Sequence, residues 1–197
     1  MSVGTVTRPS PQALPAPRLF TRAEYHRLAE ANLFFQERVE LLNGVIVAMS
    51  PQNSPHAGTV HRLLRILLRL LGTDMAIRVQ APIILDDWSE PEPDLALCQP
   101  DPDDYTRAHP HASQVLLVIE VADTSLTYDR SEKAAAYATS GIPEYWIVNL
   151  PDRQVEVRTA PDRAAQRYRQ TLLVSTGESL ALLGHQTLPV AAILPPC

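Results

Sequence analysis

Apolar and polar positions along the chain follow patterns that predict a sheet with flanking helices. The run from Gln114 to Ala122 is apolar on both alternating faces as far as Glu120, which indicates a central strand covered on both sides. An Asn-Gly pair between two apolar runs predicts a hairpin over residues 39–49. Further apolar or β-branched runs predict strands over residues 76–80, 82–85, 95–98, 144–149, 154–158 and 166–174.

Polar start signals mark three helices, over residues 22–31, 54–71 and 130–140. Thr21 and Asp129 each have a glutamate three residues later, the pattern of a capping box. Ser54 stands before a proline, as expected for an N-cap serine followed by proline at the first helical position. Gly72 and Gly141 are the expected stops of the second and third helices.

The order of these elements predicts an α/β fold with a mixed central sheet flanked by helices, preceded by an N-terminal helix and hairpin. We expect a single domain over residues 20–197, because neither an internal repeat nor a second domain is visible. Residues 1–19 are rich in proline and show little periodicity, which predicts a disordered or loosely attached arm.

The net charge and the cysteine content argue against several classes of protein. The net charge of -5 argues against bulk attraction to nucleic acid, although acids clustered over residues 86–104 leave room for a local basic face. Two cysteines, Cys98 and Cys197, make no disulfide framework, and no apolar run reaches the roughly 18 residues of a membrane helix. We therefore expect a cytoplasmic protein without a membrane partner. Motifs of zinc hydrolases, kinases and serine hydrolases are absent from the sequence.

Two carboxylates and one lysine form the candidate chemistry. Glu120 lies near the end of the central strand, where a buried carboxylate has to be paired, metal-bound or functional. Asp94 opens the neighbouring strand, and hard oxygen ligands of this kind suit Mg²⁺, with Mn²⁺ as a substitute. Lys133 is the only lysine among 17 basic residues. Its amine could orient or deprotonate an attacking water, or stabilise charge developing on a phosphate.

Each candidate also has a purely structural interpretation. Asp94 would be a carboxylate at the start of a strand, and Glu120 would belong to a buried ion pair in which Lys133 is a candidate partner. Glu40 in the hairpin would be half-exposed, and His56 in the first turn of the second helix would be a packed or capping histidine. A solvated helix face and a phosphate-binding surface are both open for the arginine row Arg62, Arg65 and Arg69.

The assembled pattern resembles the Uma-two family of restriction endonucleases, a bacterial branch of the PD-(D/E)xK nuclease superfamily. The resemblance extends from about Arg22 to about Gln186. It is carried by Glu-Leu-Leu-Asn-Gly at 40–44, Ser50–Pro51 with His56, and Pro-Glu-Pro-Asp-Leu at 91–95. The strongest stretches are Ile-Glu-Val-Ala-Asp-Thr-Ser at 119–125, Tyr-Asp-Arg-Ser-Glu-Lys at 128–133 and Gly-Ile-Pro-Glu-Tyr-Trp-Ile-Val at 141–148.

This resemblance implies a restriction-endonuclease-like sheet in which Asp94 and Glu120 are the motif carboxylates and hold Mg²⁺. The lysine of the simple nuclease motif would stand two residues after Glu120, where this chain has Ala122. The family's recurring Asp-Arg-x-x-Lys pattern suggests that Lys133 substitutes from the following helix. The resemblance also suggests a homodimer.

We therefore expect a metal-dependent endonuclease acting on DNA, with Asp94, Glu120 and Lys133 as its catalytic core. Glu40 and His56 would be auxiliary, completing the acidic side of the site or contacting phosphate. The alternative is a catalytically silent nuclease-fold module that binds nucleic acid or a protein partner, and the missing lysine at Ala122 supports it.

Overall fold

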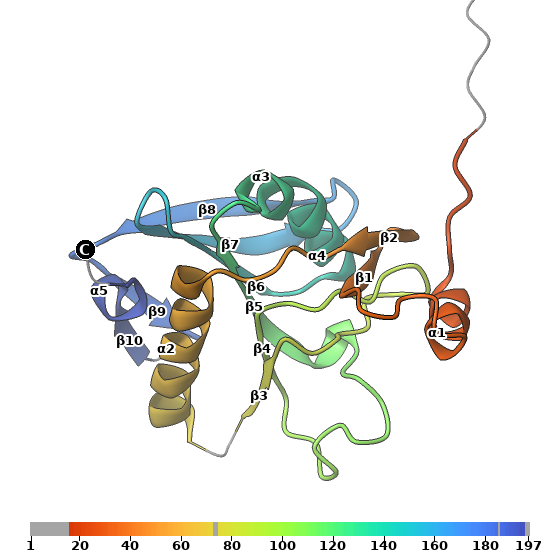
Figure 1. The fold of residues 1–197 in the computed structure, drawn as a ribbon. Coiled ribbons are helices and arrows are strands. Elements are labelled where there is room, and N and C mark those ends of the chain that lie inside the picture. Colours follow the sequence, from red (N-terminus) through yellow and green to blue (C-terminus); the bar gives the residue numbers. More distant parts are fainter. Residues whose placement is uncertain (1–15, 73–74, 185, 196–197) are drawn as a thin grey trace, which may run out of the picture.

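A six-stranded mixed sheet forms the centre of the computed structural model, which describes residues 16–72, 75–184 and 186–195 (Figure 1). The strands lie side by side in the order β3-β4-β5-β6-β7-β8. Neighbours are antiparallel except β5 and β6, which run parallel. The predicted mixed sheet is confirmed. Its strands are β3 (Ala76–Val79), β4 (Leu95–Cys98), β5 (Val115–Ala122), β6 (Glu144–Asn149), β7 (Gln154–Asp162) and β8 (Arg167–Ser175).

A helical crossover joins the parallel strands β5 and β6, as this pairing requires. It consists of α3 (Leu126–Tyr128), a π-helical turn over Asp129–Lys133, hereafter the π turn, and α4 (Ala134–Ser140). Gly141 ends α4 at φ 78°, a left-handed conformation that glycine adopts without penalty. The predicted start of this helix was wrong, because helical structure begins at Leu126 and Asp129 lies inside it.

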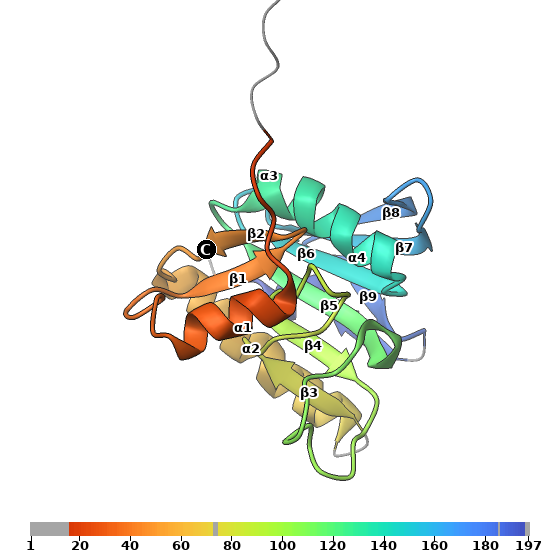
Figure 2. The same cartoon turned by 90° about the vertical axis from the view of Figure 1, so that its right-hand side faces the viewer.

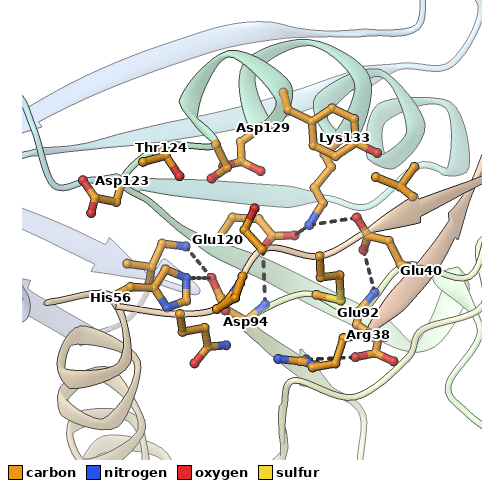
Figure 3. A pocket seen from close by; sticks show the side chains of 18 of the residues that line it. Arg38, Glu40, His56, Glu92, Asp94, Glu120, Asp123, Thr124, Asp129 and Lys133 are labelled. Atoms are coloured by element: carbon orange, nitrogen blue, oxygen red, sulfur yellow. Dashed lines mark hydrogen bonds and ion pairs between the residues drawn. The ribbon is translucent and has the colours of Figure 1, made fainter. Parts of the chain in front are cut away.

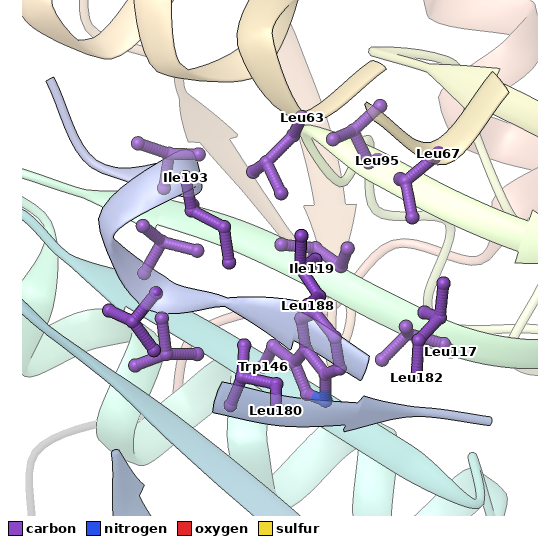
Figure 4. Close-up of a cluster of buried hydrophobic side chains, with 14 of the residues drawn as sticks. Leu63, Leu67, Leu95, Leu117, Ile119, Trp146, Leu180, Leu182, Leu188 and Ile193 are labelled. Atoms are coloured by element: carbon purple, nitrogen blue, oxygen red, sulfur yellow. The ribbon is translucent and has the colours of Figure 1, made fainter. Parts of the chain in front are cut away.

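One face of the sheet is covered by α2 (Ser54–Leu71), α5 (Val190–Ile193) and the hairpin of β9 (Ser179–Leu182) and β10 (Gln186–Pro189) (Figures 1 and 4). Their apolar side chains close over the sheet in one buried cluster, which the sequence predicts for α2. Asn53 rather than Ser54 is the N-cap of α2, since its side chain accepts a hydrogen bond from the backbone of His56. The largest fully buried side chains of the cluster are Leu63, Leu67, Leu95, Leu97, Leu117, Ile119 and Trp146.

The opposite face of the sheet is covered by the crossover helix. Val118 and Ile147 of the sheet lie in a second buried cluster with Tyr137 and Ala138 of α4. Because both faces of β5 are covered, nearly every side chain of this strand is buried, as its apolar pattern predicts.

The N-terminal elements lie together at one end of the sheet (Figure 2). The capping box of Thr21 and Glu24 opens α1 (Arg22–Glu30), and the Asn-Gly turn joins β1 (Val39–Leu42) to β2 (Val45–Ala48), both as predicted. Residues 82–85 do not form the predicted strand and contribute one isolated bridge, between Ile84 and His111. A short 3-10 helix, Ala112–Gln114, precedes β5.

The predicted arm over residues 1–19 lies outside the described residues, apart from 16–19, which form neither helix nor strand. In the part of the chain that the structure describes, no helix is both long and apolar enough to cross a membrane.

Candidate active site

All five residues predicted for the site line one cleft of about 310 Å³ beside the central strand (Figure 3). Its walls come from the β1–β2 hairpin, the first turn of α2, the chain entering β4, the end of β5 and the π turn. The five residues are Glu40, His56, Asp94, Glu120 and Lys133. The first and the last of them are 93 positions apart in the sequence.

Asp94 and Glu120 are held side by side by the antiparallel pairing of β4 with β5, in which Leu95 lies opposite Ile119. The backbone N–H of Asp94 donates to Oε2 of Glu120 at 3.3 Å. In return, the backbone N–H of Val121 donates to Oδ2 of Asp94 at 2.9 Å. Both carboxylates are buried, so these backbone donors fix them at the floor of the cleft.

Lys133 reaches Glu120 from the π turn. Its Nζ lies 2.9 Å from Oε1 of Glu120 and 3.5 Å from Oε1 of Glu40. The hydroxyl of Tyr137, one helical turn further on, donates to the same Glu120 oxygen at 2.8 Å. Burial alone would lower the pKa of Lys133, but the carboxylates of Glu120, Glu40 and Asp129 outweigh it and raise this pKa. The amine therefore stays protonated at neutral pH.

At Glu120, unlike at Lys133, burial has a larger effect on the pKa than the attraction of opposite charge. Burial, together with the neighbouring carboxylates of Asp94 and Asp129, raises the pKa of Glu120 to about 8 against the attraction of Lys133. This carboxyl group therefore holds its proton more tightly than an ordinary glutamate does.

His56 pairs with Asp94. Its Nε2 lies 2.9 Å from Oδ2 of Asp94, and the amide of Gln80 donates to Oδ1 at 3.2 Å. Burial alone would raise the pKa of Asp94, but the hydrogen bond and charge of His56 lower it. Burial alone would lower the pKa of His56, but the hydrogen bond and charge of Asp94 raise it. The geometry therefore favours the ionised pair.

Glu40 is buried rather than half-exposed. Only 2% of it is accessible, and its Oε2 accepts a hydrogen bond from the backbone N–H of Glu92 at 3.1 Å. With Oε1 facing Lys133, Glu40 bridges the hairpin and the π turn across the cleft.

Three residues at the site were not singled out from the sequence. Asp129 is buried and lines the cleft, and its Oδ2 accepts a hydrogen bond from Ser125 Oγ at 2.6 Å. Its place in the Asp-Arg-x-x-Lys pattern could have revealed it, but its position before a capping glutamate suggested an N-cap instead. Tyr137 could have been found from its spacing of four residues after Lys133, whereas no local signal marks Gln80.

The carboxylate oxygens of Asp94 and Glu120 are the type of ligand that a hard, hydrated cation prefers. Mg²⁺, for example, binds through one or two carboxylates and keeps several waters. Within the described ranges, no three His, Cys, Asp or Glu side chains are arranged to hold a metal ion by themselves. A cation at this pair would therefore complete its coordination with water or substrate oxygens.

Comparison with known proteins agrees with this geometry. The family model Uma2, described as "Putative restriction endonuclease", matches residues 22–191. The chain belongs to the Uma2 family. Its structure is similar to the crystal structure of "a putative nuclease belonging to DUF820" from Anabaena variabilis ATCC 29413, with a TM-score of 0.66 and 11% sequence identity. That similarity covers 88% of this chain and 97% of the other, and shows the fold alone. A search of curated proteins found no match.

The family and the restriction-endonuclease-like fold expected from the sequence are thus confirmed. In this Uma2 protein the position two residues after Glu120 is Ala122, which is fully buried in the apolar cluster beneath α4. The amine that comes closest to Glu120 is brought there by the π turn instead.

Proposed function

We propose that this Uma2 protein is a metal-dependent endonuclease that hydrolyses phosphodiester bonds of DNA. The observation that carries the proposal is the buried contact between Lys133 and Glu120, beside Asp94, in an open cleft. A buried, desolvated cluster of two acids and one amine is costly to build, and such clusters concentrate at functional sites.

The charge of the cleft supports a requirement for metal. Six acidic side chains line it, against two permanently charged basic ones, Arg38 and Lys133. A phosphate group would be repelled from such a cleft unless a cation entered with it. Asp94 and Glu120 would hold Mg²⁺, or Mn²⁺ in its place. When bound, this ion polarises a phosphoryl oxygen and lowers the pKa of a bound water. The six acids are Glu40, Glu92, Asp94, Glu120, Asp123 and Asp129.

The protonated amine of Lys133 suits a donor rather than a general base. It would orient the attacking water by donating a hydrogen bond to a lone pair of the water oxygen, or it would donate to a phosphate oxygen as charge develops there. His56 would keep Asp94 ionised and correctly oriented, and its raised pKa would let it contact phosphate as a cation. Glu40 would hold Lys133 in place when the bond between Lys133 and Glu120 loosens.

Contact with the DNA backbone is proposed for the outer face of α2. Arg62, Arg65 and Arg69 lie on the side of α2 opposite its buried stripe, and none forms an ion pair with a described acid. The same helix starts at the cleft with His56, so the arginine row leads away from the site. A homodimer, which would double this basic face on a chain of net charge -5, stays a prediction.

The second candidate is a catalytically silent module that binds nucleic acid or a protein. Ala122 in place of the motif lysine favours it. The position of Lys133 opposes it, because an amine that had lost its role would be expected in solvent rather than buried against Glu120.

A nicking assay separates the two candidates. Supercoiled plasmid is incubated with the wild-type protein, Glu120→Gln, Lys133→Ala and the matched control Glu132→Gln, an exposed acid on the π turn. Each is tested with Mg²⁺, Mn²⁺ or EDTA. Metal-dependent nicking by wild type and control, lost in both site variants, is the expected result. No cleavage, together with no rise in melting temperature on adding metal, would favour the silent module. Cleavage surviving both site substitutions would refute the proposed site.

A further inference from the structure

The π turn is the element that carries Lys133 into the cleft. Turns of this kind are rare within helices and are frequently found at functional sites. Here the first and last residues of the turn, Asp129 and Lys133, are both buried and both line the cleft (Figure 3). The backbone conformation of the turn therefore decides where the amine lies relative to Glu120.

Two side chains of the sheet hold this backbone from outside the helix. The hydroxyl of Tyr145 on β6 donates to the carbonyl oxygen of Asp129 at 3.1 Å. Nη1 of Arg158 on β7 donates to the carbonyl oxygen of Arg130 at 2.9 Å. Two consecutive peptide groups at the start of the π turn are thus tied to two neighbouring strands.

A buried carboxylate joins these ties together. Oε1 of Glu156 on β7 accepts from Nε of Arg130 at 2.8 Å and lies 2.6 Å from its Nη2. Oε2 accepts from Nη2 of Arg158 at 3.1 Å. Glu156 is 2% exposed and does not line the cleft. One acid between two guanidinium groups makes charge-assisted, directional bonds, which fix geometry better than apolar packing does.

We propose that Tyr145, Glu156 and Arg158 are positioning residues that hold the π turn so that Lys133 meets Glu120. The catalytic consequence rests on the proposed nuclease function, but the geometric claim does not. Were this network merely structural, its loss would lower stability and leave the surroundings of Lys133 unchanged. Since it acts on the backbone of the turn, its loss moves the amine.

The amine can be observed directly, because Lys133 is the only lysine of the chain. Protein labelled with ¹³C,¹⁵N-lysine therefore gives a single set of lysine side-chain NMR signals. Tyr145→Phe removes one hydroxyl, and Glu156→Gln removes the charge between the arginines while keeping its shape. The matched control is Asp162→Asn, which breaks the pair of Asp162 with Arg169 further along β7.

The expected result is a shift of the Lys133 Cε and Nζ signals in Tyr145→Phe and Glu156→Gln, and none in Asp162→Asn. Unchanged Lys133 signals in the folded variants would overturn the proposal. Tyr145→Phe alone decides the matter if Glu156→Gln does not fold, because it keeps the buried ring in place.

Nicking rates, measured on the same proteins, give the catalytic consequence. The two positioning variants should lose about 10–100-fold in kcat, the usual cost of removing a partner behind a functional group, with KM for DNA unchanged. A wild-type protein without nuclease activity whose Lys133 signals still shift in the variants would refute the proposed function and keep the positioning role. Normal kcat in both folded variants of an active enzyme would refute the role in catalysis.

Discussion

The amine of Lys133 lies 2.9 Å from Oε1 of Glu120, and both groups are buried. The only lysine of the chain therefore has Glu120 as its nearest carboxylate partner. Glu40 at 3.5 Å and the nearby charge of Asp129 act on the same amine. One positive charge thus compensates three buried acids, and this imbalance governs how the cleft responds to substitution, pH and metal.

Removal of the amine should destabilise the metal-free protein strongly. In Lys133→Met, Glu120 and Glu40 keep their burial and lose their partner, which typically costs about 3–5 kcal/mol. The loss should be smaller at about pH 5 than at about pH 9, because Glu120 can take up a proton. Urea unfolding in EDTA at both pH values measures it. The control Arg65→Met, on the exposed face of α2, should change stability by less than about 0.5 kcal/mol. Equal losses at both pH values would contradict this account.

The residues of the site could be predicted where a local signal marks them. Glu120 interrupts an apolar run, Asp94 opens one, and Lys133 is the only lysine of the chain. Gln80 and Tyr137 could not be identified this way, because their roles consist of hydrogen bonds to Asp94 and Glu120 that only the tertiary fold creates.

The fold could be predicted where periodicity is strong, as in the central strand and α2. Errors arose at helix starts. Asn53 and Ser54 are nearly equal as caps by residue type, and they are distinguished by the extended backbone of Asn53, with φ -85° and ψ 169°, and by its hydrogen bond from the backbone of His56. Asp129 was mistaken for a cap because the ties of Tyr145 and Arg158 to the π turn are tertiary. The hairpin β9–β10 and helix α5 were not predicted, and the four residues of α5 make only about one helical turn, too few to show a helical period.

Metal binding should become tighter as pH rises. Burial holds the pKa of Glu120 at about 8 in the metal-free protein, so below that pH a cation must displace a proton. The affinity for Mn²⁺ should fall about tenfold for each pH unit below 8 and level off above it. Calorimetric titrations in buffers with different ionisation enthalpies give both the affinity and the number of protons released. Glu120→Gln should lose both the binding and the proton release. An affinity that does not vary with pH would show that Glu120 is no ligand.

The pair of His56 and Asp94 should stabilise the metal-free protein within a defined pH window. The raised pKa of His56 means that its contribution is fully present below about 6.5 and is lost as pH rises through the folded value. The lowered pKa of Asp94 means that its contribution is present above about 3.9 and is lost as pH falls through the folded value. The difference in unfolding free energy between wild type and His56→Gln, measured in EDTA, should reach about 1–3 kcal/mol near pH 5 and shrink toward pH 9. A difference that grows toward alkaline pH would refute the ionised pair.

The arginine row of α2 should be visible in the salt dependence of DNA binding. Neutralising Z phosphates gives a plot of log K against log salt concentration a slope of about -0.9Z. Three arginines, Arg62, Arg65 and Arg69, therefore make this slope steeper by up to about 2.7. Fluorescence anisotropy with a labelled duplex measures this slope, in a Glu120→Gln background that prevents cleavage. The triple Gln variant of this row should have a shallower slope and weaker binding. A control triple with the same charge change, at the exposed Arg27, Arg107 and Arg167, should keep the wild-type slope. Because net charge is equal in the two triples, equal effects would mean that charge alone matters and that α2 is not the contact surface.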